Sequence, residues 1–254
     1  MKNTIPLILS LFIATLLLAA CSTPRTVLDD EELQPAYITA DSLVSLVPDY
    51  SESLNTISGK GRAMVSEPGS SERVTLEYYS NRQTSLITIR TGVGIEGGSI
   101  LADRDSILIY NRVDKIAEKV PVTEGRLTNV GSIASLNMLD LFNFVFHPEE
   151  IQRIFDDGEH YVVMLENEVL VRVQKNSGLI REVRRPVSSP GAAYSQIEYE
   201  GYATIEGFQL PRKITIFSRD GNSRAVFLVQ QLEVNSELPP LELSIPDNVP
   251  ILRP

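Results

Sequence analysis

Two histidines are the side chains in this chain best suited to acid–base or metal chemistry. His147 stands beside Pro148, and His160 stands at the expected start of a strand. Neither has a partner at a metal-binding spacing such as HxxxH, and the nucleophile motifs GxSxG and SxxK are absent from the sequence. We therefore predict no catalytic residue, no metal site and no cofactor, with both histidines structural or exposed.

Two pairs of aspartates stand where turns are expected. Asp103 and Asp105 lie between two strand-like segments, and Asp156 and Asp157 precede a glycine. A pair of carboxylates can act as acid and base, but aspartates in turns commonly accept hydrogen bonds from the backbone of their own turn. We interpret both pairs as solvated turns, and the sequence as that of a protein without enzymatic activity.

Cys21 is the only cysteine, and it ends the run LAAC after an apolar leader. Residues 1–20 have the form of a secretory signal peptide, with Lys2 before the apolar stretch and small residues at its end. The run resembles a bacterial lipobox, in which the thiol is acylated by diacylglycerol and the cysteine becomes the first residue. Each buried acyl methylene contributes about 0.8 kcal/mol, so lipidated Cys21 would hold the protein on a membrane. The alternatives are an ordinary signal peptide with an incidental cysteine and an uncleaved anchor.

Three glycines, Gly92, Gly94 and Gly97, formally match the dinucleotide-binding pattern GxGxxG. That motif binds a pyrophosphate only where a strand leads in and a helix leads out. Here a second strand-like segment follows, so we exclude nucleotide binding and predict a glycine-rich loop that exposes Val93 and Ile95. Exposed aliphatic side chains on such a loop suggest contact with lipid or with an apolar cargo. A tight turn without a binding role is the plainer alternative.

The chain is acidic, with a formal net charge of −10. Loss of residues 1–20 would remove one base, Lys2, and no acid, which gives −11 for the mature chain. Nucleic acid is excluded as a partner, because its phosphates would be repelled and the sequence has no basic stripe. The acidity favours a dispersed monomer. With Cys21 modified no thiol is left for a disulfide, so packing of the core must stabilise the fold.

The chain divides into a signal peptide (1–20), a flexible tether (21–36) and one domain (37–254). The acidic run at 29–32 is interpreted as part of the solvated tether, with a role in sorting as the alternative. Helical spacing of apolar residues begins at Asp41, a plausible N-cap, and resumes after Pro48 as far as Ile57. The period then changes to two, which predicts strands at 74–79, 86–89, 99–102, 106–111, 115–122, 161–166, 169–174, 179–184, 194–205, 213–218 and 224–234.

One apolar segment interrupts the strands. Residues 132–146 have helical spacing, with a cap at Gly131 or Ser132, and are apolar on nearly every side; Pro148 could open a second short helix through Phe155. So apolar a helix must lie against the inner side of the sheet. We predict a mainly β fold, a single curved antiparallel sheet forming an incomplete, half-open barrel of about ten or eleven strands around a short apolar helix.

Three segments in this order resemble the LolA and LolB superfamily of lipoprotein carriers. They are LNTISGKG at 54–61, TGVGIEGGSILADRDSILIYNR at 91–112, and the apolar helix up to His147. The resemblance covers most of residues 37–250 and is closer to an uncharacterised family of Gram-negative lipoproteins with that fold. It implies a cavity for acyl chains, and a loop similar to the apolar loop with which LolB helps to place lipoproteins in the outer membrane.

The resulting hypothesis is a lipid-anchored outer-membrane protein, facing the periplasm, that binds acyl chains of lipoproteins or another amphiphile. Ser22 supports the outer membrane, since Asp after the cysteine is the inner-membrane signal in enteric bacteria. The alternative is a non-enzymatic structural or assembly lipoprotein docking on an envelope complex, and a hydrolase is the least favoured reading. The residues expected to contact ligand or membrane are Val93, Ile95, Leu136, Leu139, Phe142 and Phe146.

Overall fold

The computed structural model describes residues 33–121, 137–186 and 194–253. One compact unit spans Gln34–Pro254. The predicted signal peptide, Cys21, most of the tether and Leu136 lie outside the described residues.

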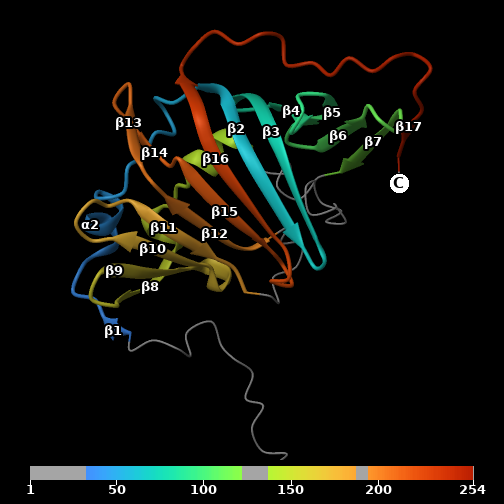
Figure 1. Cartoon of the computed structure of the whole chain (residues 1–254). Helices are drawn as coiled ribbons and strands as arrows, with labels where there is room; N and C mark the ends of the chain where they lie inside the picture. Colours follow the sequence, from blue (N-terminus) through green and yellow to red (C-terminus); the bar gives the residue numbers. More distant parts are fainter. Residues whose placement is uncertain (1–32, 122–136, 187–193, 254) are drawn as a thin grey trace, which may run out of the picture. The chain divides into compact units, whose positions relative to one another are not determined.

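One large sheet forms most of the described chain, in the order β1-β8-β9-β10-β11-β12-β15-β16-β2-β3-β4-β5-β6-β7-β17. It is curved and open (Figure 1), antiparallel throughout except where β17 pairs parallel with β7. Its strands are β1 (Gln34–Pro35), β2 (Thr56–Glu67), β3 (Ser70–Asn81), β4 (Ser85–Thr91), β5 (Glu96–Ala102), β6 (Ser106–Asn111), β7 (Ile116–Pro121), β8 (Ile151–Asp156), β9 (His160–Leu165), β10 (Leu170–Gln174), β11 (Ile180–Arg184), β12 (Tyr194–Glu200), β15 (Lys213–Ser218), β16 (Arg224–Val234) and β17 (Ile251–Leu252); β13 (Ala203–Ile205) and β14 (Phe208–Leu210) pair separately.

The prediction of one curved, open, mainly β sheet is confirmed, but the number of strands was too low. The described part of the sheet has 15 strands rather than ten or eleven. β2 is the largest omission, because Gly59 and Gly61 interrupt its alternation of apolar side chains and Ile57 also fitted a helix. Its twelve residues pair with β3 along their whole length and with β16 along most of it. β2 is a central strand because it pairs with strands on both sides, one of them distant in the sequence, and the local spacing of apolar residues carries no information about such pairing.

The first helix is also shorter than expected. α2 (Ala40–Val44) has its N-cap at Thr39, whose Oγ1 accepts a hydrogen bond from the Ser42 backbone N–H, so Asp41 is not the cap. The helical spacing beyond Pro48 is not realised. Asp49 Oδ1 accepts from the Ser51 backbone N–H at 2.8 Å and starts a turn there.

The apolar helix expected at 132–146 is reduced to α4 (Met138–Phe142) in the described residues. The Asn137 side chain caps its start, and the backbone leaves the helical region at Asn143. Pro148 opens a 3-10 turn, η2 (Pro148–Glu150), and the expected second helix is instead β8. Apolar residues three and four positions apart predicted a helix here. Residues 151–156 instead form a strand, because they pair with β9. In the described residues no helix is long and apolar enough to cross a membrane.

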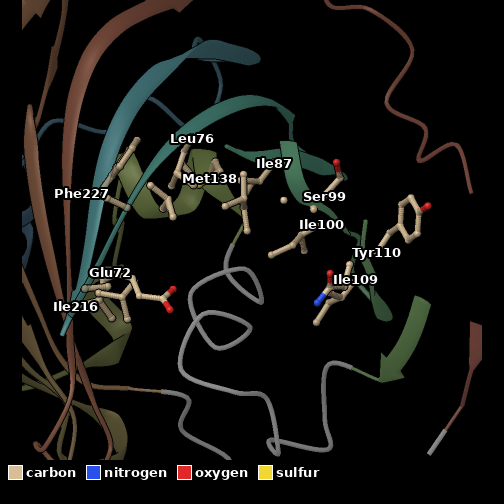
Figure 2. Close-up of a pocket in the computed structure, with 18 residues that line it drawn as sticks. Glu72, Leu76, Ile87, Ser99, Ile100, Ile109, Tyr110, Met138, Ile216 and Phe227 are labelled. Atoms are coloured by element: carbon tan, nitrogen blue, oxygen red, sulfur yellow. The ribbon is translucent and has the colours of Figure 1, made fainter. Parts of the chain in front are cut away.

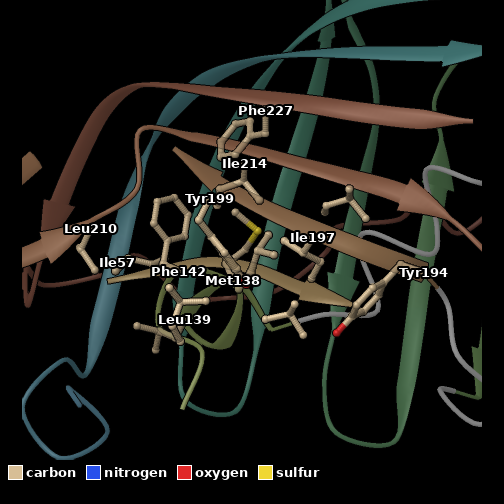
Figure 3. Packing of buried hydrophobic residues seen from close by; sticks show 14 of the residues in the cluster. Ile57, Met138, Leu139, Phe142, Tyr194, Ile197, Tyr199, Leu210, Ile214 and Phe227 are labelled. Atoms are coloured by element: carbon tan, nitrogen blue, oxygen red, sulfur yellow. The ribbon is translucent and has the colours of Figure 1, made fainter. Parts of the chain in front are cut away.

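The main hydrophobic core covers the inner face of the sheet. One row of cross-strand partners shows how the core is built: Val163, Val171, Val183 and Ile197 follow one another across β9 to β12, each at most 2% exposed. α4 packs on the same face, and Figure 3 shows Phe142 and Met138 among the buried residues. A smaller cluster joins Tyr110 and Ala117 to the C-terminal segment through Val249.

Candidate functional site

A cavity of about 270 Å³ lies beside α4, against the inner face of β2 to β6 (Figure 2). An apolar cavity of about 150 Å³ is already large enough to hold benzene, so this one can take an apolar ligand group. Alternate residues of β2, β3, β4 and β16 line it, as the two-residue period of a sheet requires, and consecutive residues of β5 and β6 form its far side. The lining residues are Ala63, Val65, Glu72, Val74, Leu76, Ile87, Ile89, Gly97, Gly98, Ser99, Ile100, Ile109, Tyr110, Asn111, Met138, Ile216, Ala225 and Phe227.

The register of the strands explains the apolar lining. Ile87 on β4 is opposite Ile100 on β5, which in turn is opposite Ile109 on β6. A second row runs from Leu76 through Ile89 to Gly98. The side chains of each row share one face, so the strands between 74 and 111 present a continuous aliphatic surface to the cavity.

Two glycines of β2 let aromatic rings lie directly on the strand. A Cβ added at Gly61 would lie 2.4 Å from Cε2 of Phe227, and one at Gly59 would lie 2.6 Å from Oη of Tyr78. Phe227 can therefore cover the backbone of β2 and still line the cavity. Burial raises the pKa of the Tyr78 hydroxyl, which stays neutral and donates to the Gln231 carbonyl at 3.2 Å. The GKG segment thus shapes one wall of the site.

A buried polar network fixes α4 beside the cavity. The Asn137 side chain donates to the Asn81 carbonyl at 2.9 Å, and its Oδ1 accepts from the Leu139 N–H at 2.8 Å. Ser85 Oγ accepts from the Met138 backbone N–H at 3.0 Å and lies 2.6 Å from Ser80 Oγ. These contacts provide acceptors for the first backbone N–H groups of α4, which have no partner within the helix. They hold Met138 as the helix residue that lines the cavity.

Three residues of the predicted helix that were expected at the ligand, Leu139, Phe142 and Phe146, are buried in the core. Phe142 stacks on Tyr78 with ring centroids 6.0 Å apart and meets Phe227 edge-on at 6.3 Å. Leu139 and Phe146 are at most 4% exposed. Leu139 lines a second cavity of about 250 Å³ on another side of α4. Contact of Leu139, Phe142 and Phe146 with a ligand stays a prediction, and Leu136 lies outside the described residues.

Val93 and Ile95 project from the turn between β4 and β5, as predicted. Their side chains are 83% and 64% exposed. The turn is held by Gly94, whose N–H donates to the Thr91 carbonyl at 2.9 Å and whose φ of +85° favours glycine. The expected strand after the glycines is β5, which runs through Gly97, so the exclusion of a nucleotide-binding turn agrees with the structure.

A third exposed aliphatic residue, Val113, lies on the neighbouring turn between β6 and β7 and is 73% exposed. Both turns are at the same end of the sheet. The Arg112 N–H donates to the Gly97 carbonyl at 3.0 Å, and its guanidinium lies 2.6 Å from the Glu96 carboxylate. Sequence reasoning missed Val113, although an aliphatic residue inside the polar turn NRVDK was a usable signal.

Three of the titratable side chains considered in the sequence, Asp103, Asp157 and His160, have structural partners. Asp103 accepts from the backbone N–H groups of Asp105 and Ser106, as expected of a solvated turn. His160 lies 3.3 Å from the Asp157 carboxylate, which also pairs with Arg172 at 2.7 Å. In the part of the chain that the structure describes, no three His, Cys, Asp or Glu side chains are grouped to hold a metal ion.

Comparisons with solved structures identify proteins with a similar architecture. A crystal structure of a DUF1329 family protein from Desulfovibrio piger matches with a TM-score of 0.57 and 13% identity, covering 79% of this chain and 93% of that one. A LolA superfamily protein from Nitrosomonas europaea matches with a TM-score of 0.54 and 12% identity, over 80% of this chain and 96% of that one. The chain has a LolA-like fold.

The LolA-like fold is shared with a third structure, a domain from Vibrio parahaemolyticus named for outer membrane lipoprotein sorting. It matches with a TM-score of 0.54 and 11% identity, over 79% of this chain and 92% of that one. Models of protein families give no match, and neither does a comparison with the sequences of curated proteins. The structural similarity confirms the fold expected from the sequence. At 11–13% identity it shows the fold alone.

Proposed function

We propose that this LolA-like protein binds the acyl chain of a lipoprotein or of another amphiphile in the cavity beside α4. The observation that carries the proposal is the apolar cavity of about 270 Å³ beside α4. The cavity is open on one side, and an open apolar hollow of this size on a protein commonly marks a binding site. Each methylene moved from water into such a site gains about 0.8 kcal/mol, and binding requires no bond to be made or broken. We propose no enzymatic activity.

The site is proposed to work at the outer membrane, with the protein anchored through lipidated Cys21 and facing the periplasm. The lipobox-like run and Ser22 support the anchor and its location. The fold of a domain named for outer membrane lipoprotein sorting is consistent with this setting. Val93 and Ile95 would contact lipid or cargo, because their turn lies where Gly97 and Gly98 form the edge of the cavity.

Binding can be tested on residues 22–254, which contain the whole compact unit Gln34–Pro254. N-phenyl-1-naphthylamine, a neutral apolar dye, should bind to this fragment, and dodecyl amphiphiles should displace it. Lipid that copurifies with the protein should be visible by mass spectrometry. Absence of dye binding, amphiphile binding and copurified lipid together would end the proposal.

A variant that fills the cavity sharpens this test. Ala225 lines the cavity, and Val226 is the next residue of β16, on the other face. Ala225→Leu should weaken dye binding by more than about tenfold, because the added carbons occupy volume that the dye would fill. Val226→Leu is the matched control and should bind the dye as the parent does. Thermal unfolding of both variants separates a filled cavity from a misfolded chain.

The alternative is a structural or assembly lipoprotein that docks on an envelope complex. The burial of Leu139, Phe142 and Phe146 favours it, since these residues pack into the core and do not line the cavity of about 270 Å³. Depletion in the cell distinguishes the two functions. Loss of a carrier would leave other lipoproteins in the inner membrane, whereas loss of an assembly factor would not.

A further inference from the structure

The polar side chains that line the cavity differ in whether they already have partners. Ser99 Oγ donates to the Glu96 carboxylate at 3.3 Å. The Asn111 side chain is used by its own turn, accepting from the Val113 N–H at 2.9 Å and donating to Asp114 at 2.7 Å. The Tyr110 ring points away from the other lining side chains in Figure 2. Of the lining residues, this leaves Glu72 as the polar side chain available to a ligand.

Glu72 ends an otherwise apolar row of cross-strand partners. The row runs from Val163 on β9 through Val171, Val183, Ile197, Ile216, Ala225 and Val65 to Glu72 on β3. Pairing between β3 and β4 stops at Val74 and Thr91, so Glu72 lies just beyond the end of β4, at the level of the glycine-rich turn. The row thus changes from buried and aliphatic to exposed and anionic at the mouth of the cavity.

Among the residues that the structure describes, no basic side chain forms an ion pair with the Glu72 carboxylate. Arg73 follows Glu72 on β3 and points to the opposite face by the alternation of a strand. Arg90 on β4 lies on that opposite face and pairs with Glu77 and Glu96, at 3.7 Å and 3.8 Å. Among the described lining residues none is basic. Figure 2 shows the Glu72 carboxylate pointing away from Ile216, toward the side of the view on which Ile109 lies.

From this arrangement we infer that Glu72 selects the polar end of the bound amphiphile, favouring a cationic head over a carboxylate. The inference rests on the proposed function and names its ligand class. An alkyl chain on the aliphatic strands would place its head at the mouth, beside Glu72. A positive head gains attraction there, while a carboxylate head meets a like charge. A partly exposed pair changes affinity by up to about fivefold, which sets the expected size of the effect.

The test uses three ligands of one chain length on residues 22–254, below their micelle concentrations at pH 7.5. Dodecylamine, glycerol monolaurate and laurate each displace N-phenyl-1-naphthylamine. The parent should bind dodecylamine about fivefold more tightly than laurate, with the neutral ligand between them. Glu72→Gln should bring the ratio close to one, and Glu72→Lys should reverse it.

The control is Glu233→Gln, which removes the same charge from the outer face of β16, where Glu233 pairs with Ser58. It should keep the preference of the parent, because net charge alone does not produce it. If all three ligands bind but Glu72→Gln leaves the ratio unchanged, or if Glu233→Gln abolishes it, the inference about Glu72 is wrong and the proposed cavity function stands. If neither dye nor ligand binds to any of these proteins, the proposed function fails and the inference fails with it.

Discussion

Two parts of the same sheet differ in how completely their inner faces are covered. In the packed half, β8 to β12, the inner residues Val163, Val171 and Val183 are fully buried. In the open half, β3 to β7, Val74 and Ile89 are only partly buried because they border the cavity. We therefore expect the packed half to contribute more to stability, while the open half leaves apolar surface unburied at the proposed ligand cavity.

The outer faces of the two halves differ in the same direction. Arg172 of the packed half lies between Asp157 at 2.7 Å and Glu182 at 3.1 Å, and its side chain is 14% exposed. Arg90 of the open half reaches Glu77 and Glu96 only at 3.7 Å and 3.8 Å, with 39% of its side chain exposed. The ion pairs of Arg172 are thus shorter and less exposed than those of Arg90.

The largest effect expected is on the core, in a matched pair of isoleucine substitutions. Ile197→Ala in the packed half should lower the free energy of unfolding by about 2–5 kcal/mol, because its neighbours cannot close the space left behind. Ile89→Ala in the open half should cost less than half as much, since Ile89 already borders open volume. Equilibrium unfolding in urea measures both changes.

Equal losses at Ile197 and Ile89 would contradict the division into a packed and an open half. Dye binding adds a second readout. Ile89→Ala should alter the affinity for N-phenyl-1-naphthylamine, and Ile197→Ala should not while the protein remains folded.

A smaller difference is expected for the two arginines. Arg172→Met should cost about 2–3 kcal/mol, since Asp157 and Glu182 would lose their partner in a partly buried place. Arg90→Met should cost at most about 1 kcal/mol, as for exposed ion pairs. Both variants keep a long apolar side chain, so the comparison isolates the charge.

The cost of Arg172→Met should also depend on pH. Burial acts to raise the pKa of Asp157, but the His160 N–H, the charge of His160 and the charge of Arg172 together hold it below its usual value. A lowered carboxyl pKa stabilises the fold above the pKa of the unfolded chain, about 3.9, and this stability is lost as the pH falls through the folded value. The difference between parent and variant should therefore shrink below about pH 4. A difference that stays constant from pH 7 to pH 3 would show that Asp157 is not its source.

The packed and open halves were not equally visible in the sequence. Strands with clear alternation and polar turns at both ends were predicted with their observed bounds, as for β6, β15 and β16. β2 was missed because its glycines serve the rings of Tyr78 and Phe227, a contact between distant segments. α4 was predicted too long because apolar residues at three and four positions fit a helix and a buried extended segment equally well.

The site itself was predicted only in part. The exposed Val93 and Ile95 could be recognised, since aliphatic residues between glycines in a turn have no core to join. The expected cavity helix contributes Met138 to the lining rather than the aromatic Phe142, because the direction of each side chain depends on how Asn137 and Ser85 orient the start of α4. No local pattern in the sequence pointed to Glu72, because its proposed role depends on where β4 ends beside it.

The smallest effect on stability is expected at the turn of Val93 and Ile95, beside the open half. Changes there should instead affect association with membranes. Val93→Ser with Ile95→Ser should change the free energy of unfolding by less than about 0.5 kcal/mol, because both side chains are already in solvent. Association with neutral phosphatidylcholine vesicles, measured by flotation of residues 22–254, should fall, since the apolar surface that would enter the membrane is removed. Leu228, an exposed residue in the middle of β16, gives the control Leu228→Ser, which should leave flotation unchanged. Equal flotation of the parent and the double variant would mean that this turn does not contact lipid, and the open half would then have to receive its ligand without it.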